Sequence, residues 1–320
     1  MKRMKAAFLD YATLGPGVDT SPLDALVDVE YYDYSPEDEI SGRLQGIEVC
    51  IVNKARVSAA TIAANPELKL IVLAATGSDN VDVSAAEANG IAVANIRGYC
   101  TPAVVQHVFA LILSLTRQIS GYRAVVDSGA WQRSNTFALF DYPIRELTGK
   151  NLGIVGYGSL GAGVAEVGRA FGMDVLVSVR PGSGDAAPAD RLPFEQVLTQ
   201  SDVLSLHCPL TDATRGLIGR PELVAMKSDA ILINTARGAL IDSEALVEAL
   251  HSGEIGGAGI DVLAKEPPTD DEPLLARGIP NLILTPHIAW TSTESRQRTL
   301  DQVAENAQDF QSGGQLRRLV

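Results

Sequence analysis

The chain has 320 residues, of which 46% are hydrophobic and 20% charged, and its net charge is −13. A chain of this length forms roughly two domains, and its apolar content excludes an intrinsically disordered protein. Because phosphate binding needs clustered lysine and arginine, no nucleic-acid partner is expected. The apolar stretches are too short to span a bilayer, so no membrane partner is expected, and the default location is cytoplasmic.

The three cysteines, Cys50, Cys100 and Cys208, are odd in number and far apart in the sequence. They predict neither a disulfide framework nor a metal site. We interpret them as small hydrophobic residues.

Short β-rich runs alternate with helix-like stretches over the first hundred residues. This alternation is typical of βαβ units and of a parallel sheet. Several helical stretches open with a serine, which can cap a helix N-terminus. The predicted strands are residues 5–9, 28–32, 47–52, 69–73 and 91–94, and the predicted helices are residues 21–27, 35–44, 58–64 and 83–88.

A long apolar helix is predicted for residues 101–119, closing near Gly121, and we interpret it as a hinge between domains. A second alternating series follows, and it predicts a doubly wound sheet of six strands. The helical tail, residues 293–311, is too small to be a domain and is expected to pack on the first layer. The predicted strands of the second series begin at Asn151 and continue with residues 174–178, 203–206, 230–234, 257–262 and 282–285.

The predicted fold class is therefore α/β, with two Rossmann-like or flavodoxin-like domains built on doubly wound parallel sheets. The first domain is expected to be discontinuous in sequence, comprising residues 1–100 plus 291–320, and the second comprises residues 101–290.

A glycine-rich turn, Gly156-Tyr-Gly-Ser-Leu-Gly161, follows a predicted strand and opens a predicted helix. In that context the G-x-G-x-x-G pattern indicates a dinucleotide site. Gly156 permits the tight turn, Gly158 lets the backbone approach a pyrophosphate, and Gly161 lets helix and strand pack closely. The helix N-terminus offers its N–H groups to the phosphates. The alternative is a glycine-rich turn that binds no ligand.

The end of the second strand of this sheet indicates which dinucleotide is bound. An acid at that position binds the ribose 2′-OH of NAD(H). Val179 and Arg180 stand there instead, and Asp174 lies at the start of the strand. Val179 avoids repulsion of a 2′-phosphate and Arg180 can pair with it, so NADP(H) is favoured over NAD(H). In the alternative, Arg180 stacks on the adenine or points to solvent, and the site discriminates weakly.

Arg237, Glu266 and His287 each follow one of the last three predicted strands. Ligands bind outside the carboxyl ends of parallel strands, so the three side chains should share the edge that receives the dinucleotide. Reduction of a 2-keto acid needs a cation for the substrate and an acid to protonate the carbonyl oxygen. Arg237 suits the first role and His287 the second, with Glu266 favouring the charged imidazole. Singly, each also fits an ordinary structural role.

The other three histidines fit the acid role less well. His207 ends a strand, but no acid follows it closely, and we interpret it as a wall of the cofactor site. His107 lies within the long apolar helix. His251 lies near a helix C-terminus, where its charge complements the dipole.

Seven short motifs occur in one order along the chain, and together they resemble those of the D-isomer-specific 2-hydroxyacid dehydrogenases, especially the glycerate dehydrogenase (hydroxypyruvate reductase) branch. The resemblance covers nearly the whole chain. The motifs occupy residues 75–82, 106–111, 153–161, 206–211, 234–238, 261–268 and 286–290.

This resemblance implies the catalytic set Arg237, Glu266 and His287. It also implies that backbone N–H groups of the loop from Thr76 through Gly77 to Ser78 bind the substrate carboxylate. Lys54 matches a position that is often lysine in this branch and faces the substrate, and a surface lysine is the alternative reading. Trp290, Trp131 and residues 137–142 are expected to set substrate size.

The resemblance further implies that Asp261 faces the nicotinamide carboxamide and that Thr235 and Ala236 line the nicotinamide ribose. The usual NADH preference does not carry over, because the branch commonly has an acid where Val179 stands. The residues expected to bind the cofactor are Gly156, Tyr157, Gly158, Ser159, Leu160, Gly161, Val179, Arg180, His207, Cys208, Pro209, Thr214, Thr235, Ala236 and Asp261.

Members of this family bind the substrate in a cleft between the two domains, which close by a hinge, so the discontinuous first domain is expected to bind substrate and the second to bind dinucleotide. They are usually homodimers joined through the dinucleotide domain and its long helix. The sequence therefore predicts an NAD(P)-dependent enzyme that reduces hydroxypyruvate or glyoxylate to the D-2-hydroxy acid. Two alternatives share the fold: a dinucleotide-sensing, corepressor-like interaction protein, and an oxidoreductase acting on another substrate such as phosphite.

Overall fold

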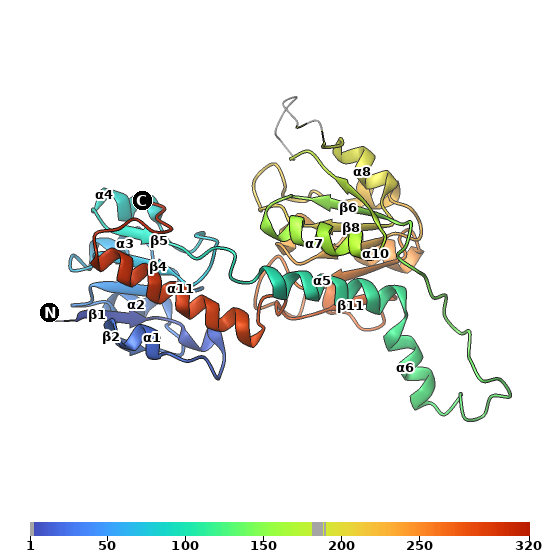
Figure 1. Ribbon diagram of the computed structural model, residues 1–320, viewed down its shortest axis with the longest axis horizontal. Helices are drawn as coiled ribbons and strands as arrows, with labels where there is room; N and C mark the ends of the chain where they lie inside the picture. Colours follow the sequence, from blue (N-terminus) through green and yellow to red (C-terminus); the bar gives the residue numbers. More distant parts are fainter. Residues whose placement is uncertain (1–2, 181–187, 189) are drawn as a thin grey trace. The chain divides into compact units, whose positions relative to one another are not determined.

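The computed structural model describes residues 3–180, 188 and 190–320. The chain divides into two compact units, one formed by Met1–Cys100 with Trp290–Val320 and the other by Thr101–Ala289. Both are α/β structures built on entirely parallel sheets (Figure 1). The fold class predicted from the sequence is confirmed.

The first unit contains five strands in the order β2-β1-β3-β4-β5. Apolar side chains alternate between its two faces, as the strand period requires, because both faces are covered by helices. Leu300 and Val303 of the C-terminal helix pack on one face, and Ile40, Ile62 and Ala86 of three short helices pack on the other. The elements are β1 (Met4–Phe8), η1 (Tyr11–Leu14), α1 (Ser21–Asp24), β2 (Val27–Tyr31), α2 (Glu37–Arg43), β3 (Val49–Val52), α3 (Ala59–Ala63), β4 (Leu70–Leu73), α4 (Val83–Ala88), β5 (Ala92–Ala94) and α11 (Thr293–Gln311).

Two local predictions for this unit are wrong. The helix expected over residues 21–27 ends at Asp24, and Val27 is already the first residue of β2, paired with Met4. Among the serines expected to cap helices, Ser58 does so by accepting the Thr61 N–H, but the Ser35 hydroxyl donates to the Leu9 carbonyl instead. One departure follows from pairing with β1 and the other from a bond to Leu9 just after β1, and no local pattern contains either contact.

The second unit contains six strands in the order β11-β10-β9-β8-β6-β7. The chain runs from β6 to its neighbour β7 and then crosses to β8 on the other side of β6. The topological switch point therefore lies between β6 and β8, where ligands bind in such sheets. The elements are β6 (Asn151–Val155), α7 (Ser159–Ala170), β7 (Asp174–Val177), α8 (Phe194–Gln200), β8 (Val203–Leu206), α9 (Arg220–Ala225), β9 (Ile231–Asn234), η2 (Gly238–Leu240), α10 (Ser243–Ser252), β10 (Gly257–Ile260), η3 (Pro273–Leu275) and β11 (Leu282–Leu284).

The long helix that opens this unit is broken, which corrects the prediction of one helix closing near Gly121. Helix α5 (Thr101–Thr116) ends before Gln118, whose φ of 53° is left-handed, and α6 (Ile119–Asp127) continues at 56° to it. Gly121 lies inside α6, where a Cβ would stand 2.8 Å from the Tyr142 ring. Because Gly121 has no side chain, the Tyr142 ring can pack against α6 at this point. By length and composition no single described helix could cross a membrane, and only the bent pair of α5 and α6 meets that test.

Candidate active site

The carboxyl edge of the six-stranded sheet brings Glu266 and His287 into direct contact. The Nδ1 atom of His287 lies 2.5 Å from Oε2 of Glu266. The other carboxylate oxygen, Oε1, accepts the Leu263 N–H at 2.8 Å. The side chains of His287 and Glu266 are 29% and 33% exposed, so both can meet a ligand. The carboxylate is anchored at one oxygen and orients the imidazole with the other.

Asp261, at the end of β10, holds the turn that carries His287. Its carboxylate is fully enclosed and accepts the Thr285 hydroxyl at 2.5 Å and the N–H groups of Ile288 and Ala289, both at 2.9 Å. His287 has a φ of 56°, a left-handed conformation that is unfavourable for a residue with a Cβ. The hydrogen bonds on both sides of His287 stabilise that conformation. The predicted role of Asp261 toward the nicotinamide stays a prediction.

His107 extends this network from α5. Its Nε2 atom lies 3.1 Å from the Thr285 hydroxyl and 3.6 Å from Oδ1 of Asp261. The sequence interpretation placed His107 in an apolar helix and missed this contact. No spacing in the sequence relates residue 107 to residue 261, because only the packing of α5 on β10 joins them.

Arg237 lies at the same sheet edge, after β9. The Asn234 side chain donates to the Arg237 carbonyl at 2.9 Å and accepts the Ala236 N–H at 3.0 Å, which shapes the turn. The exposed guanidinium donates to the Ala236 carbonyl at 2.7 Å. A Cβ at Gly238 would stand 1.9 Å from the Leu263 carbonyl carbon, so glycine is required where this loop meets the loop of Glu266. The structure thus brings all three predicted catalytic residues to one edge.

The glycine-rich turn has the geometry that the sequence predicts. Gly156 has a φ of +95°, and a Cβ there would lie 2.4 Å from the Cys208 nitrogen. A Cβ at Gly161 would lie 2.1 Å from the Gly156 carbonyl oxygen, so only glycine allows α7 to start this close to β6. A Cβ at Gly158 would meet nothing within 4 Å, which leaves room for a ligand beside the backbone. Tyr157, Ser159 and Leu160 complete the turn.

Two predicted cofactor residues carry buried polar atoms without a partner among the described residues. These are Nδ1 of His207 and Oγ1 of Thr235. Buried polar atoms are nearly always hydrogen-bonded, so each of these two atoms can accept a hydrogen bond from a polar ligand or donate one to it. Burial lowers the pKa of His207 to about 4, which keeps its ring neutral, and Nε2 pairs with the Ser205 hydroxyl at 2.8 Å. Together with the glycine turn, these atoms fit a nicotinamide dinucleotide.

The remaining cofactor predictions fall around the same edge. Thr214 is buried, and its hydroxyl donates to the Pro209 carbonyl at 2.7 Å, so it shapes the loop after β8. Cys208 is buried in this loop, and burial raises the pKa of its thiol. Val179 and Arg180 follow β7, and Ala236 is half-buried before Arg237.

The predicted substrate residues of the first unit lie at the carboxyl edge of its own sheet. Asp10, buried after β1, accepts the N–H groups of Asn53 at 2.9 Å, Lys54 at 2.5 Å and Ala55 at 2.8 Å. The Asn80 side chain donates to the Ala55 carbonyl at 2.8 Å and so ties this loop to residues 76–80. Sequence reasoning missed Asp10, although an acid directly after the predicted strand 5–9 is a signal that could have found it.

Thr76 and Trp290 are also held within this first unit. The Thr76 hydroxyl donates to the Ile96 carbonyl at 2.9 Å, and Gly77 and Ser78 follow it in the same loop. The Trp290 ring packs edge-on against Tyr99, with ring centroids 6.2 Å apart. The substrate and catalytic sets predicted from the sequence therefore belong to different units.

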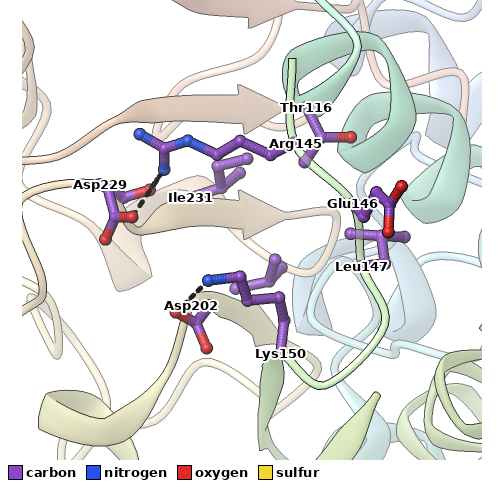
Figure 2. Close-up of a pocket in the computed structure, with 9 residues that line it drawn as sticks. Thr116, Arg145, Glu146, Leu147, Lys150, Asp202, Asp229 and Ile231 are labelled. Carbon is purple, nitrogen blue, oxygen red and sulfur yellow. Dashed lines mark hydrogen bonds and ion pairs between the residues drawn. The ribbon is translucent and has the colours of Figure 1, made fainter. Parts of the chain in front are cut away.

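A pocket in the second unit lies at the opposite, amino-terminal edge of the sheet (Figure 2). Arg145 pairs with Asp229 at 2.8 Å, and Lys150 stands 3.8 Å from Asp202. Burial raises the pKa of Asp202, but hydrogen bonds from Asn151 and Lys227 outweigh it, and the net pKa is lowered. The pairs Arg145–Asp229 and Lys150–Asp202 attach the segment before β6 to the sheet. This pocket is separate from the candidate active site.

The family model for the D-isomer specific 2-hydroxyacid dehydrogenase, NAD binding domain, matches residues 109–289, more than half of the chain. Glycerate dehydrogenase of Methylorubrum extorquens is 46% identical over 97% of this chain and 96% of its own length. The chain belongs to the D-isomer specific 2-hydroxyacid dehydrogenases. The family predicted from the seven motifs is confirmed, and this dehydrogenase is an oxidoreductase whose second unit contains the NAD-binding domain.

Two further relatives extend the comparison. Hydroxypyruvate reductase of Blautia hydrogenotrophica is 36% identical over 97% of this chain and 98% of its own length. An acyclic imino acid reductase, solved with NADPH and D-Arg, superimposes with a TM-score of 0.86 at 28% identity, covering 99% of this chain and 100% of its own. The enzyme reading is thereby favoured over the corepressor-like alternative.

Proposed function

We propose that this dehydrogenase reduces hydroxypyruvate to D-glycerate, or glyoxylate to its 2-hydroxy acid, and that it prefers NADP(H) over NAD(H). The observation that carries the proposal is the 2.5 Å contact between His287 and Glu266 at the sheet edge that also bears Arg237 and the glycine-rich turn. This edge combines an acid, a cation and a dinucleotide turn, which is what reduction of a 2-keto acid requires.

His287 is the proton donor in this proposal. Its Nδ1 is held by Glu266, so the proton available to a substrate is the one on Nε2. The carboxylate stabilises the imidazolium that exists before the transfer. When bound, the reduced dinucleotide supplies the hydride that the carbonyl carbon accepts. His287 then protonates the carbonyl oxygen, and the product is the hydroxyl group.

Arg237 binds the substrate carboxylate and carbonyl oxygen. A guanidinium presents paired N–H donors in the geometry that a carboxylate accepts, and the exposed Arg237 side chain is available at the edge. We assign substrate binding to the first unit, through the Thr76 to Ser78 loop and Lys54, with Trp290 limiting substrate size. Dinucleotide binding falls to the second unit, through the glycine turn and the unpaired atoms of His207 and Thr235.

The preference for NADP(H) follows from the end of β7. Val179 stands where an acid would bind a ribose 2′-OH and repel a 2′-phosphate. Arg180 follows it at the surface. The imino acid reductase that superimposes on this chain was solved with NADPH, which agrees with the proposed preference.

Oxidation of NADPH and NADH by the purified protein tests the proposal, with hydroxypyruvate, glyoxylate, pyruvate and a bulky 2-keto acid as substrates. We expect the fastest turnover with hydroxypyruvate or glyoxylate, and D-glycerate as the product from hydroxypyruvate by chiral chromatography. Parallel reactions with phosphite and NADP⁺, and with a 2-keto acid plus an amine, measure the competing chemistries. Turnover confined to one of those, or an L product, would overturn the proposal.

We also propose a homodimer formed through α6 and the segment that follows it. Figure 1 shows this arm extending away from the six-stranded sheet of its unit. The arm is ordered by bonds such as that from Trp131 Nε1 to the Phe137 carbonyl at 3.0 Å, yet Phe137 and Phe140 are 93% and 88% exposed. Several large apolar side chains exposed on one arm favour an interface there. Other exposed apolar residues of the arm are Ile119, Val126, Tyr142 and Ile144.

Sedimentation of the wild-type protein and of the double variant Phe137→Asp, Phe140→Asp tests the assembly. We expect a dimer for the wild type and a monomer for the variant. A variant with Asp at Val224, an exposed apolar residue on α9 outside the arm, is the control and should stay dimeric. A monomeric wild type contradicts this assembly and leaves the catalytic proposal standing.

A further inference from the structure

Arg191 lies beside the carboxyl end of β7, at a position that the sequence did not single out. Leu192 pairs with Ser178 in parallel, through a bond from the Val179 N–H to the Leu192 carbonyl at 2.8 Å and one from the Leu192 N–H to the Val177 carbonyl at 2.9 Å. Because β6 occupies the other side of β7, this pairing is on the outer side of the sheet. Arg191 is therefore fixed at the strand end that discriminates between dinucleotides.

The Arg191 side chain reaches from there to the glycine-rich turn. Its Cζ atom stands 4.2 Å from the centre of the Tyr157 ring, and Tyr157 is the second residue of that turn. The guanidinium thus lies between the turn after β6 and the end of β7. In a dinucleotide-binding sheet this is the place of the adenosine ribose, because the pyrophosphate lies on the turn and the 2′ position faces the end of the second strand.

Within the described part of the chain, the charge of Arg191 is poorly satisfied. The side chain is only 17% exposed, and its Nη1 atom is buried with no hydrogen-bond partner among the described residues. The carboxylate paired with it belongs to Asp190, 3.6 Å from Nε, and that side chain is 73% exposed. An enclosed guanidinium with an unpaired donor is unfavourable in isolation and favours an anion beside it.

The anion that fits is a phosphate monoester. A guanidinium only donates hydrogen bonds, and its planar fork matches phosphate oxygens, whereas a ribose hydroxyl is usually bound by an acid at this position. The geometry points to Arg191 as the residue that binds the adenosine 2′-phosphate of NADP(H), with the Tyr157 ring as the platform that holds it. This inference rests on the proposed function, since it assigns a specificity residue to the same dinucleotide site.

Isothermal titration of the intact protein with adenosine 2′,5′-bisphosphate and with 5′-AMP isolates the 2′-phosphate without any turnover. We expect the wild type to bind the bisphosphate more tightly, and Arg191→Ala to weaken it by roughly 10-fold to 100-fold, as the loss of a charge-assisted hydrogen bond predicts. Affinity for 5′-AMP should not change. Arg191→Lys, which keeps the charge without the fork, should fall between the two, and Tyr157→Leu should weaken bisphosphate binding less than Arg191→Ala.

Arg169→Ala is the matched control, because this exposed arginine lies in the last turn of α7, at the other end of that helix from the glycine turn. It should leave both affinities unchanged. Equal weakening of both ligands by Arg191→Ala and Arg191→Lys would make the stack on Tyr157 purely structural and overturn the inference. A wild type that binds NADH and 5′-AMP but binds the bisphosphate no more tightly than 5′-AMP would overturn it together with the proposed preference for NADP(H), while the proposed reduction of a 2-keto acid stands. Absence of binding by NADH, NADPH and both probes would instead refute the proposed function.

Discussion

Two buried aspartates organise the two units in the same way. Asp10 follows β1 of the first unit and accepts three backbone N–H groups from the loop of Lys54. Asp261 follows β10 of the second unit and accepts two backbone N–H groups and a hydroxyl from the loop of His287. In each case a carboxylate that is almost fully enclosed fixes the loop that presents a functional side chain. A buried carboxylate is tolerated because neighbouring residues of the same unit donate hydrogen bonds to it.

Asp10 and Asp261, each of which clamps a loop through hydrogen bonds, differ in the groups around them. Asp261 also faces the imidazole of His107, whereas the three N–H groups that donate to Asp10 belong to the backbone. All four histidines of the chain belong to the second unit. The first unit thus positions loops through backbone hydrogen bonds, and the imidazole groups of the chain all lie in the second unit.

The largest expected effect concerns the proton donor. His287→Gln should reduce kcat by roughly 100-fold or more, because the general acid is lost. Lys54→Gln, on the clamped loop of the first unit, should raise KM and reduce kcat far less. Steady-state kinetics with hydroxypyruvate measures both. Comparable losses of kcat in the two variants would contradict the assignment of substrate binding to the first unit and of proton donation to the second.

The largely enclosed imidazole of His207 should make the second unit acid-sensitive. Burial depresses its pKa to about 4 in the folded state, so its contribution to stability is present above pH about 6.5 and is lost as the pH falls through the folded pKa, because the unfolded chain takes up the proton first. The free energy of unfolding should drop by about 2 kcal/mol between pH 7.5 and pH 5 from this group.

Urea unfolding of wild type and His207→Gln at both pH values checks this. The variant should lose about 2 kcal/mol less between the two pH values than the wild type does. His251→Gln, at an exposed helix end, is the control and should follow the wild type. An identical pH dependence in all three proteins would contradict the assignment of this acid sensitivity to His207.

Asp261→Asn should disturb the chemical step. The amide nitrogen cannot accept a hydrogen bond, so one N–H group of Ile288 or Ala289 loses its acceptor and the left-handed turn at His287 loosens. We expect kcat to fall by roughly 10-fold, since small displacements of a catalytic group are costly. Asp261→Glu keeps the charge and should recover part of kcat if the clamp acts by positioning. A kcat equal to that of the wild type would show that the turn holds without the clamp.

The smallest effect is expected for Asp10→Asn, the counterpart in the first unit. The Lys54 loop should lose one or two of its three bonds, depending on which oxygen the amide nitrogen replaces, and KM for the 2-keto acid should rise by a few-fold while kcat stays close to the wild-type value. The two Asn variants, measured side by side, therefore separate positioning of substrate from positioning of the acid. A fall of kcat without a change in KM would indicate that Asp10, like Asp261, affects the chemical step and not substrate binding.

Much of the site was predictable because residues that follow the strands of a parallel sheet lie at the same edge of that sheet. Arg237, Glu266 and His287 each follow a strand, and the carboxyl ends of parallel strands must meet at one edge. The glycine turn was also predictable, since a strand, three spaced glycines and a helix leave few conformations. The roles of these residues in catalysis and binding stay predictions.

The alternation of strands and helices, the glycine spacing and the chemistry at strand ends are local properties, and the sequence by itself determined the α/β class and the candidate catalytic residues. Only the tertiary structure decided that His107 faces Asp261, that Asp10 clamps the Lys54 loop and that Arg191 lies over Tyr157. The break at Gln118 belongs with them. These features depend on which surfaces pack together, and packing joins residues whose separation along the chain follows no period.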